Sequence, residues 1–291
     1  FKVEGLRLLY SIGILLYTLG VRVASLWMEK ARLMVRGWGL TPSLPERGQG
    51  GEAAWFHASS LGEFEQARPV MEQYRREHPE TKILLTFFSP SGYEVRKHYE
   101  GADWVMYLPM DTPRNARRFV REMNPSVVFF VKYDFFFNYL RELKGRGVPT
   151  YLFSAIFRPS HYFFQWYGGW FLKQLHCYTH LFVQNEESLR LLQAHGISHC
   201  SLAGDTRFDR VDQIAQQAKR YPEIEAFIGD SPVLMAGSSW PPDEANLKHF
   251  VDHYDAPLKL ILAPHLIDEP HLQQIESLLG KENCIGYSRL P

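Results

Sequence analysis

A glutamate stands immediately after an apolar run in the stretch from Trp55 to Pro69, WFHASSLGEFEQARP. The run predicts a buried strand, and SLGE (residues 60–63) has the spacing of a capping box, in which a glutamate supports the start of a helix. The carboxyl ends of strands border the ligand crevice of open α/β sheets. Glu63 is therefore a candidate general base, with a plain helix cap as the alternative role.

Two further turns carry groups that suit an anion. Residues 89–92, SPSG, follow the next apolar run, and residues 237–244, GSSWPPDE, open a later helix. Hydroxyls and free amides at a helix N-terminus can receive a phosphate or a carboxylate, although most such turns are only caps. The candidate substrate-binding residues of the three turns are Ser60, Gly62, Ser89, Ser91, Gly92, Ser238 and Ser239.

Polar and charged residues also follow other apolar runs. Asp134 comes after SVVFFVKY, Arg158 after TYLFSAI and Arg207 after CSLAGDT. Each cation alone is an ordinary surface residue, but several at strand ends facing one crevice would form an anion-binding cleft. The candidate contacts of this kind are Asp134, Arg158, Gln184, Arg207 and His265, which directly follows a strand pattern.

Metal and nucleotide-loop motifs are absent from the sequence. There is no G-x-x-x-x-G-K-[ST], G-x-G-x-x-G or H-E-x-x-H, so P-loop, dinucleotide and zinc-protease chemistry lack their usual signatures. Cys177, Cys200 and Cys284 are widely spaced and favour a reducing compartment over a disulfide framework. We expect no metal and no cofactor.

Six apolar runs must position most of these residues. AAWFHAS, KILLTFF, DWVMYLP, SVVFFVKY, TYLFSAI and HLFVQN alternate with amphipathic segments between residues 53 and 185. Near-continuous apolar strands separated by helices are typical of a parallel sheet covered on both faces. They predict a doubly wound, Rossmann-like α/β lobe.

The alternation continues to the chain end with CSLAGDT, VLMAGSS, LKLILAP and NCIGYS. We expect these four strands to form a second Rossmann-like lobe over residues 186–291. We expect this lobe to be incomplete, because such lobes usually have five or six strands; either the protein is longer than this chain or the fold closes in another way. Residues 41–52, rich in proline and glycine, predict a linker.

The N-terminal 40 residues predict a membrane anchor. Residues 8–27 contain one charged side chain, Arg22, and Lys30, Arg32 and Arg36 follow. About 20 apolar residues cross a bilayer, and the cations suit its cytoplasmic face. The helix either spans the membrane or lies in its interface; a signal peptide and a buried helix are the alternatives.

The composition fits a globular protein that does not bind nucleic acid. Of 291 residues, 45% are hydrophobic and 22% charged, and Lys+Arg and Asp+Glu both total 32. That length and composition can bury a substantial core, whereas the balanced charge provides no global field that would attract nucleic acid.

In order and spacing, these segments resemble the 3-deoxy-D-manno-octulosonic acid (Kdo) transferases of lipopolysaccharide synthesis. The matching elements run from the apolar helix to the chain end: HASSLGE, LTFFSPSG, YLPMDTP, QNEES, GDTRFDRV, GSSWPPDE and the APH turn. The resemblance implies a two-lobed GT-B glycosyltransferase at the cytoplasmic face of the bacterial inner membrane. The implied reaction moves Kdo from CMP-Kdo to the lipid A precursor, with inversion and without a metal.

The resemblance also implies roles for the lobes and residues. Glu63 would be the general base, in an acceptor lobe formed by residues 53–185. Arg158, Arg207 and the helix N-termini would receive the phosphate and the carboxylate of the donor, bound by a partial donor lobe at 186–291. The acceptor would enter from the membrane side past HYFFQWYGGWF (161–171), where exposed aromatic side chains would favour an acyl-chain groove.

The chain departs from the pattern of many family members at several places. Asp134 stands for a glutamate, and phenylalanines follow it in place of Leu-Trp-Pro. Arg207 occupies a position that is often lysine, and no arginine separates Pro264 from His265. A glycine-rich turn with an Asn and a Glu that helps to hold the nucleotide would lie beyond Pro291.

Two other kinds of function stay open. One is another GT-B enzyme that uses a UDP-sugar, such as an epimerase or a lipid disaccharide synthase, because fold alone does not separate these activities. The other is a non-catalytic, membrane-tethered α/β binding protein in which Glu63 serves only as a helix cap.

Overall fold

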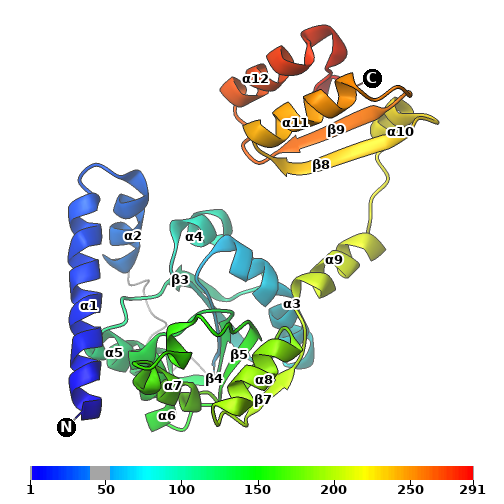
Figure 1. The fold of residues 1–291 in the computed structure, drawn as a ribbon. Coiled ribbons are helices and arrows are strands. Elements are labelled where there is room, and N and C mark those ends of the chain that lie inside the picture. The colour runs from blue at the N-terminus through cyan, green and yellow to red at the C-terminus, as the bar shows by residue number, and fades with distance from the viewer. Residues whose placement is uncertain (1, 40–52, 291) are drawn as a thin grey trace. The chain divides into compact units, whose positions relative to one another are not determined.

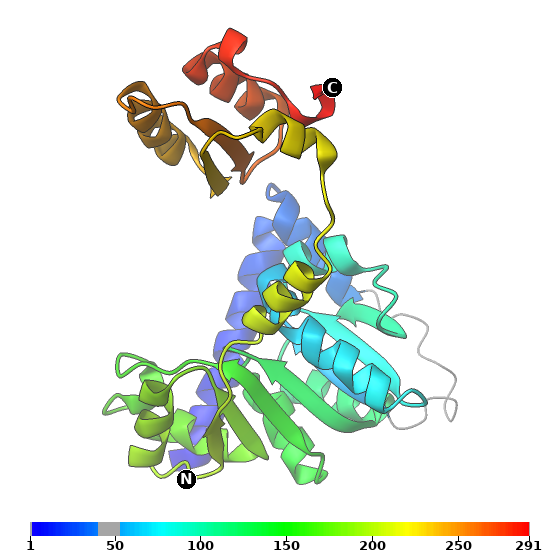
Figure 2. The same cartoon turned by 90° about the vertical axis from the view of Figure 1, so that its right-hand side faces the viewer.

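The structure, a computed structural model, describes residues 2–39 and 53–290. They form two compact units that divide between Gln216 and Gln217, and each is described by itself (Figures 1 and 2). The predicted linker at 41–52 lies outside the described residues.

The first unit is built on seven parallel strands in the order β3-β2-β1-β4-β5-β6-β7. They are β1 (Ala53–Ala58), β2 (Lys82–Phe87), β3 (Trp104–Tyr107), β4 (Pro125–Val131), β5 (Thr150–Ala155), β6 (His180–Val183) and β7 (Cys200–Leu202). The strand order reverses where β1 lies beside β4, with Phe56 opposite Phe129. The turns that follow β1 and β4 therefore meet at the switch point of the sheet, where open α/β sheets bind ligands.

Helices cover both faces of this sheet (Figure 2). They are α3 (Leu61–Glu77), α4 (Pro90–Arg96), α5 (Pro113–Met123), α6 (Phe137–Gly145), α7 (Gly169–Gln174), α8 (Glu186–Ala194) and α9 (Arg207–Gln216), with 3₁₀ turns η1 (Tyr162–Phe164) and η2 (Leu175–Cys177). Phe56 of β1 packs with Phe64 of α3, whereas Trp55 packs on the other face with Phe119 of α5 and Leu140 of α6. Neighbouring residues of one strand are thus buried on opposite faces, which explains the near-continuous apolar runs.

The predicted boundary between residues 185 and 186 is wrong. The segment CSLAGDT was expected to begin the second lobe, but β7 pairs with β6, with Phe182 opposite Ser201, and completes the first sheet. The strand–helix–strand pattern is the same within one sheet as between two, so the sequence did not reveal which sheet β7 joins.

The second unit has two parallel strands, β8 (Val233–Ser239) and β9 (Lys259–Pro264). Its helices are α10 (Pro222–Ile228), α11 (Pro241–Asp252) and α12 (Glu269–Leu279), followed by 3₁₀ turns η3 (Lys281–Asn283) and η4 (Tyr287–Arg289). The predicted strand NCIGYS is therefore wrong: among the described residues it pairs with no strand and lies in and between the two turns.

The N-terminal segment forms a helical hairpin of α1 (Lys2–Ala24) and α2 (Glu29–Gly39) (Figure 1). Tyr10 of α1 packs edge-on against Phe137, with ring centroids 5.0 Å apart, and beside Trp170. Gly37 of α2 lies so close to the ring of Tyr107 that an added Cβ would be 2.1 Å from it. The hairpin is thus part of the first unit.

Candidate active site

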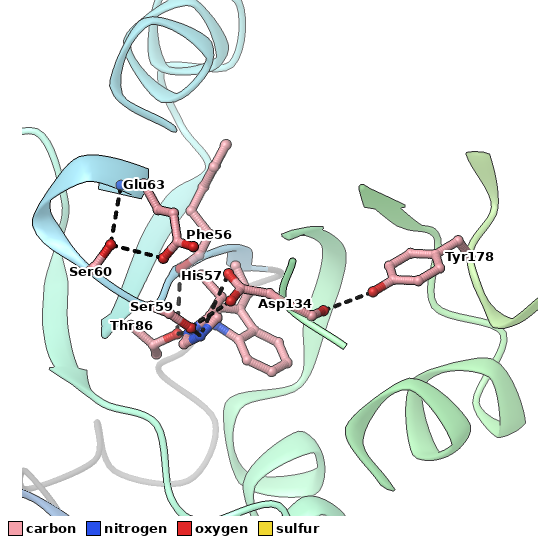
Figure 3. Close-up of polar contacts among 9 residues, drawn as sticks. Phe56, His57, Ser59, Ser60, Glu63, Thr86, Asp134 and Tyr178 are labelled. Carbon is pink, nitrogen blue, oxygen red and sulfur yellow. Dashed lines mark hydrogen bonds and ion pairs between the residues drawn. The ribbon is translucent and has the colours of Figure 1, made fainter. Parts of the chain in front are cut away.

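Glu63 lies in the first turn of α3, beyond the carboxyl end of β1. Ser60 is the N-cap of this helix: its Oγ accepts from the Glu63 N–H at 3.4 Å, and its hydroxyl donates to Glu63 Oε2 at 3.1 Å (Figure 3). The predicted helix cap is confirmed, and the carboxylate is turned to the serine hydroxyl. Gly62 is exposed and an added Cβ there would meet nothing within 4 Å.

A second carboxyl group, that of Asp134, follows β4 at the same switch point. Its Oδ1 lies within hydrogen-bonding distance of the Ser59 hydroxyl oxygen, at 2.5 Å, and its backbone oxygen accepts from the Tyr178 hydroxyl at 2.8 Å. Figure 3 shows Asp134 and Glu63 on either side of the turn that follows β1. The strand order brings them together although 70 residues of chain lie between positions 63 and 134.

A buried polar chain leads from Ser59 into the sheet. The Ser59 hydroxyl lies 3.2 Å from His57 Nε2, and His57 Nδ1 lies 2.7 Å from Thr86 Oγ1. The Trp55 indole N–H donates to the same threonine oxygen at 2.8 Å. His57, Thr86 and Trp55 are fully buried, so these bonds are closed to solvent and hold the turn against β2.

Both carboxyl groups are harder to ionise than free ones. Burial raises the pKa of Glu63, although the Ser60 hydroxyl and the charge of Lys132 oppose the rise. Burial, and then the charge of Glu63, raise the pKa of Asp134 well above its usual value. Two nearby carboxyl groups in different environments are the arrangement from which acid and base roles arise.

The predicted second turn lies beside the first. The Ser89 N–H donates to the Ser59 oxygen at 2.8 Å, and Ser89 caps α4, with its Oγ accepting from the Ser91 N–H at 3.3 Å. Gly92 is buried against Phe87, where an added Cβ would lie 2.3 Å from the ring. Glycine is therefore needed there for packing, while the anion-binding role of this turn stays a prediction.

The cations predicted at strand ends differ in their partners. Arg158 follows β5 and is exposed. Arg207 begins α9 and donates to Asp205 Oδ2 through Nε and Nη2, at 2.9 and 2.6 Å. The Gln184 side chain donates to the Ser154 oxygen at 2.8 Å and links β6 to β5. Arg207 is therefore already paired with a carboxylate, which no sequence pattern indicated.

In the second unit, Ser238, Ser239 and His265 lie together at the ends of β8 and β9. His265 donates its N–H to the Ser239 oxygen at 2.9 Å and stacks on Trp240 with centroids 4.5 Å apart. The Ser239 hydroxyl is buried and donates to Glu244 at 3.0 Å, whereas Ser238 is exposed with φ of 56°. Of the two serines, Ser238 is the one that a ligand can reach.

Sequence reasoning named no site role for His57, Ser59 and Thr86. The first two lie in HASSLGE itself, so the signal was a second serine beside the predicted cap. The Gln66 side chain was missed too: it donates to Asp205 Oδ1 at 2.8 Å and ties α3 to the loop before α9. Among the described residues, no group of three or more His, Cys, Asp or Glu side chains is arranged to hold a metal ion.

The carboxyl groups and helix N-termini at the switch point suit a reaction in which a proton is removed from a substrate that carries an anionic group. A half-buried carboxylate at the switch point can accept a proton from a bound hydroxyl, and the N-termini of α3 and α4 open at the same edge of the sheet. These features describe a reaction type and leave the substrate open.

Comparisons with known sequences indicate a family. Residues 33–210, more than half of the chain, match the family described as 3-Deoxy-D-manno-octulosonic-acid transferase (kdotransferase). The 3-deoxy-D-manno-octulosonic acid transferase of Chlamydophila psittaci is 25% identical over 253 residues, covering 82% of this chain and 56% of the relative. The transferase of the same name from Aquifex aeolicus is 35% identical over 109 residues, 37% of this chain and 29% of the relative. The chain spans little more than half the length of the first of these relatives.

Solved structures support the fold. The UDP-GlcNAc 2-epimerase of Neisseria meningitidis is similar with a TM-score of 0.56 at 13% identity, over 79% of this chain and 69% of that one. A putative UDP-N-acetylglucosamine 2-epimerase of Listeria monocytogenes has a TM-score of 0.55 at 13% identity, over 82% and 68%. The expected GT-B type α/β fold is thereby confirmed; at this identity the likeness concerns fold alone.

Proposed function

The chain belongs to the 3-deoxy-D-manno-octulosonic-acid transferase (kdotransferase) family, and we propose that it is the part of a glycosyltransferase that binds the acceptor and carries the base. The reaction is the transfer of Kdo from CMP-Kdo to the lipid A precursor, with inversion and without a metal ion. The observation that carries the proposal is the placement of Glu63, a half-buried carboxyl group at the switch point of a parallel sheet.

Glu63 acts as the general base. It accepts the proton of the acceptor hydroxyl as the oxygen forms a bond to the anomeric carbon of Kdo, while the bond from that carbon to the phosphate oxygen breaks and CMP leaves with the electron pair. A positioned base contributes roughly 10²–10⁴-fold to such a step. The raised pKa of Glu63 makes it a stronger proton acceptor than a free carboxylate.

The donor's phosphate and sugar carboxylate need cations and amides. Arg158 and the capped N-termini of α3 and α4 offer these in the first unit. Two nitrogens of Arg207 already donate to the Asp205 carboxylate. Arg207 therefore binds a donor anion either after its guanidinium turns away from Asp205 or through its remaining N–H groups.

The N-terminal helix has the reverse of the usual amphipathic arrangement. Its polar Arg7, Tyr10, Ser11 and Thr18 are partly covered by the protein. The large apolar side chains are exposed: Leu6, Leu8, Leu9, Ile12, Leu15, Leu16, Tyr17, Leu19 and Val23. A soluble helix turns its apolar face inward, so this outer face fits a lipid environment.

We place α1 in the membrane interface at the cytoplasmic face of the bacterial inner membrane. Gly5–Ala24 is long and apolar enough to cross a bilayer, but Tyr10 packs against Phe137 and Trp170 of the globular unit, which holds one side of the helix on protein. A helix with one apolar face exposed lies along a membrane. Exposed arginines at positions 114, 117, 118 and 121 of α5, which begins beside Asp111, the partner of Tyr10, suit anionic headgroups.

The aromatic segment at 161–171 divides between core and surface. Phe163 and Trp170 are buried, whereas Trp166 is 95% exposed and Tyr167 is 53% exposed. Trp170 also lies beside Tyr10 of α1. The exposed pair supports a lipid-contacting role for this segment, in keeping with the preference of such rings for membrane interfaces.

The decisive experiment measures Kdo transfer from CMP-Kdo to a tetraacyl lipid A precursor by the full-length gene product. Glu63→Gln should lower the rate at least a hundredfold at matched folding. The control is Glu77→Gln, which changes an exposed glutamate at the far end of the same helix and should leave the rate within about twofold, as expected for a surface substitution.

The outcomes separate the alternatives. Transfer by Glu63→Gln at the wild-type rate would keep the enzyme and reduce Glu63 to a helix cap. No transfer by a folded wild type would reject the proposal, and turnover of a UDP-sugar in its place would establish the GT-B alternative. Binding of CMP-Kdo without turnover would favour a non-catalytic binding protein.

A further inference from the structure

The carboxyl group of Asp134 is buried without a good partner for a negative charge. The residue is 3% exposed, and its Oδ2 atom accepts no hydrogen bond from the described residues. His57 Nε2 lies 3.8 Å from this oxygen, but burial lowers the pKa of His57 to about 3, so the ring is neutral. Burial and then the charge of Glu63 raise the pKa of Asp134 in spite of the Ser59 hydroxyl and the backbone bonds of Val131 and Ser59, because a buried carboxylate without a counterion is costly.

Glu63 is the better site for that charge. It is only half-buried, lies in the first turn of α3 where the helix dipole favours an anion, and accepts from the Ser60 hydroxyl. Burial raises the pKa of Glu63, and the Ser60 hydroxyl and then the charge of Lys132 oppose that rise. Of two adjacent carboxyl groups, the one near water and a cation ionises first.

The chain from Asp134 to Thr86 can carry protons in either direction. If Asp134 is protonated on Oδ1, it donates to Ser59, Ser59 donates to His57 Nε2, and His57 Nδ1–H donates to Thr86. The Thr86 hydroxyl then turns to the Phe56 oxygen, 3.5 Å away. The Trp55 indole can only donate to Thr86, which leaves both directions open.

If Asp134 is ionised, every bond in the chain reverses. Thr86 then donates to His57 Nδ1, His57 Nε2–H donates to Ser59, and Ser59 donates to Asp134 Oδ1 across the same distances of 2.7, 3.2 and 2.5 Å. Each arrangement uses every hydroxyl and ring proton. The tautomer of His57 therefore records whether Asp134 Oδ1 carries a proton.

The hydrogen-bond chain from Asp134 to Thr86 is bordered by aromatic side chains. Phe136 meets the face of His57 edge-on with centroids 4.9 Å apart, and Phe130 lies at 5.8 Å. The titratable or charged groups that face the two carboxyl groups are His57, Lys132 and Tyr178, and the Tyr178 hydroxyl is occupied by the backbone oxygen of Asp134. Protons reach Asp134 by rearrangement of this chain or by opening of the turn.

We propose that Asp134 is a positioning residue that holds a proton on Oδ1 in the resting site, through the reversible hydrogen-bond chain Asp134–Ser59–His57–Thr86, and so leaves the negative charge of the pair on Glu63. The consequence for catalysis rests on the proposed function, in which Glu63 is the base. The location of the proton does not depend on that function, so it is tested separately.

The first test reads the tautomer of His57 by ¹⁵N NMR of the full chain labelled at histidine, with His57→Gln used to assign the signal. At pH 7 the expected form is the neutral ring with the proton on Nδ1. A neutral ring with the proton on Nε2 at pH 7 would show that Asp134 Oδ1 carries no proton and would overturn the proposal. The measurement needs no substrate, so it stands even if the proposed reaction fails.

Two variants sharpen this test. In Asp134→Asn the side chain stays neutral at every pH, so the tautomer should not change between pH 6 and pH 9. In wild type, any change on raising the pH must go from Nδ1–H to Nε2–H, and the opposite change would contradict the chain. Ser59→Ala separates His57 from Asp134 and should remove the pH response altogether.

The second test compares the acid limb of the pH–rate profile in wild type and Asp134→Asn. If Asp134 is already neutral, the midpoint of this limb stays within about 0.3 pH unit, whatever happens to kcat. If Asp134 is charged in wild type, removing the charge lowers the midpoint by about 1 unit or more, which would overturn the proposal. Absence of transfer by wild type would reject the proposed function and leave the NMR result to decide this one.

Discussion

The Tyr10 hydroxyl donates to Asp111 Oδ2 at 2.6 Å and fastens the N-terminal helix to the first unit. The Asp111 side chain is buried and also accepts from the backbone N–H groups of Asn138 and Tyr139, at 3.1 and 3.0 Å. One carboxyl group thus joins α1 to the start of α6, and its removal should destabilise both helices.

Tyr10→Phe should loosen α1 while keeping its ring contacts. Loss of a hydrogen bond to a buried carboxylate costs about 1.5–3 kcal/mol, so hydrogen exchange of the α1 amides should become faster and the unfolding midpoint should fall. Tyr17→Phe is the control, because the Tyr17 ring stacks near Phe88 and is 47% exposed. Equal exchange in Tyr10→Phe and wild type would show that the hydrogen bond does not hold the helix.

Asp111 should make stability fall as pH rises from about 4 to about 6. Burial raises the pKa of Asp111 to about 6 despite the opposing donors Tyr10, Asn138 and Tyr139, whereas an unfolded aspartate has a pKa of about 3.9. Between these values the folded chain binds more protons than the unfolded chain, so its stability decreases with pH. Wild type should therefore lose stability relative to Asp111→Asn over this range in denaturant titrations.

Asp103 provides a control of opposite sign. Partial burial raises its pKa, but the Ile83 N–H, Arg75 and Lys82 outweigh this and hold the pKa at about 2. Its contribution is present above about pH 4 and lost only as the pH falls toward 2. The difference between wild type and Asp103→Asn should hence be flat from pH 4.5 to 6.5, and a slope there would contradict the assignment.

His271 should keep its proton to a higher pH than a free histidine does. Its Nδ1 and Nε2 face two acceptors, the Leu266 oxygen at 2.9 Å and Glu244 Oε2 at 3.0 Å. The bonds to Glu244 and then to Leu266 raise its pKa, so the stability that it contributes is complete below about pH 6.5 and is lost as pH rises through the folded value. Glu244→Gln should lower the NMR titration midpoint of His271, whereas Asp243→Asn, whose carboxylate bonds the Trp240 N–H, should not.

Two glycines near the site should respond to alanine in opposite ways. Gly92→Ala forces a Cβ against the buried Phe87 ring and should destabilise the protein by about 1–3 kcal/mol. Gly62 is helical with open space around it, so Gly62→Ala should be neutral or stabilise by up to about 1 kcal/mol. Chemical denaturation measures the free energy of unfolding of both variants. Equal changes in the two would show that an added Cβ at Gly92 is accommodated without strain.

A charge on the outer face of α1 should weaken binding to lipid. Leu16 is 64% exposed, and burying a leucine is worth about 1.5–3 kcal/mol. Leu16→Glu should lower partitioning into vesicles that contain phosphatidylglycerol by roughly tenfold or more. Val95→Glu, which adds the same charge at a 57% exposed position on α4, should change it little; equal losses in both would argue against α1 as the contact.

The first six strands were predictable because each is a short apolar run flanked by helical patterns. The seventh was assigned to the wrong unit because three residues, Cys200–Leu202, carry no information on which strand they pair with. The contact between Ser59 and Asp134 could not be predicted either. It exists because β1 neighbours β4, and strand order is decided by packing of the whole unit.

Glu63 shows the opposite case, in which a local pattern was sufficient. The spacing in SLGE predicted the cap, and Ser60 forms it. The second bond, from the Ser60 hydroxyl to the Glu63 carboxylate, depends on a rotamer that sequence spacing does not specify. The candidate base was thus visible in the sequence, and the groups that set its charge became visible only in the structure.

The bond between Tyr10 and Asp111 also imposes an order on biosynthesis. The two residues are 101 positions apart, so a ribosome that adds about 5–20 residues per second makes Asp111 roughly 5–20 s after Tyr10. During that interval the outer face of α1 is ready to meet lipid, while its inner face still lacks the partner that will hold it. If α1 lies at the membrane as proposed, the nascent chain attaches there first, and the α/β unit then folds against a helix that is already in place.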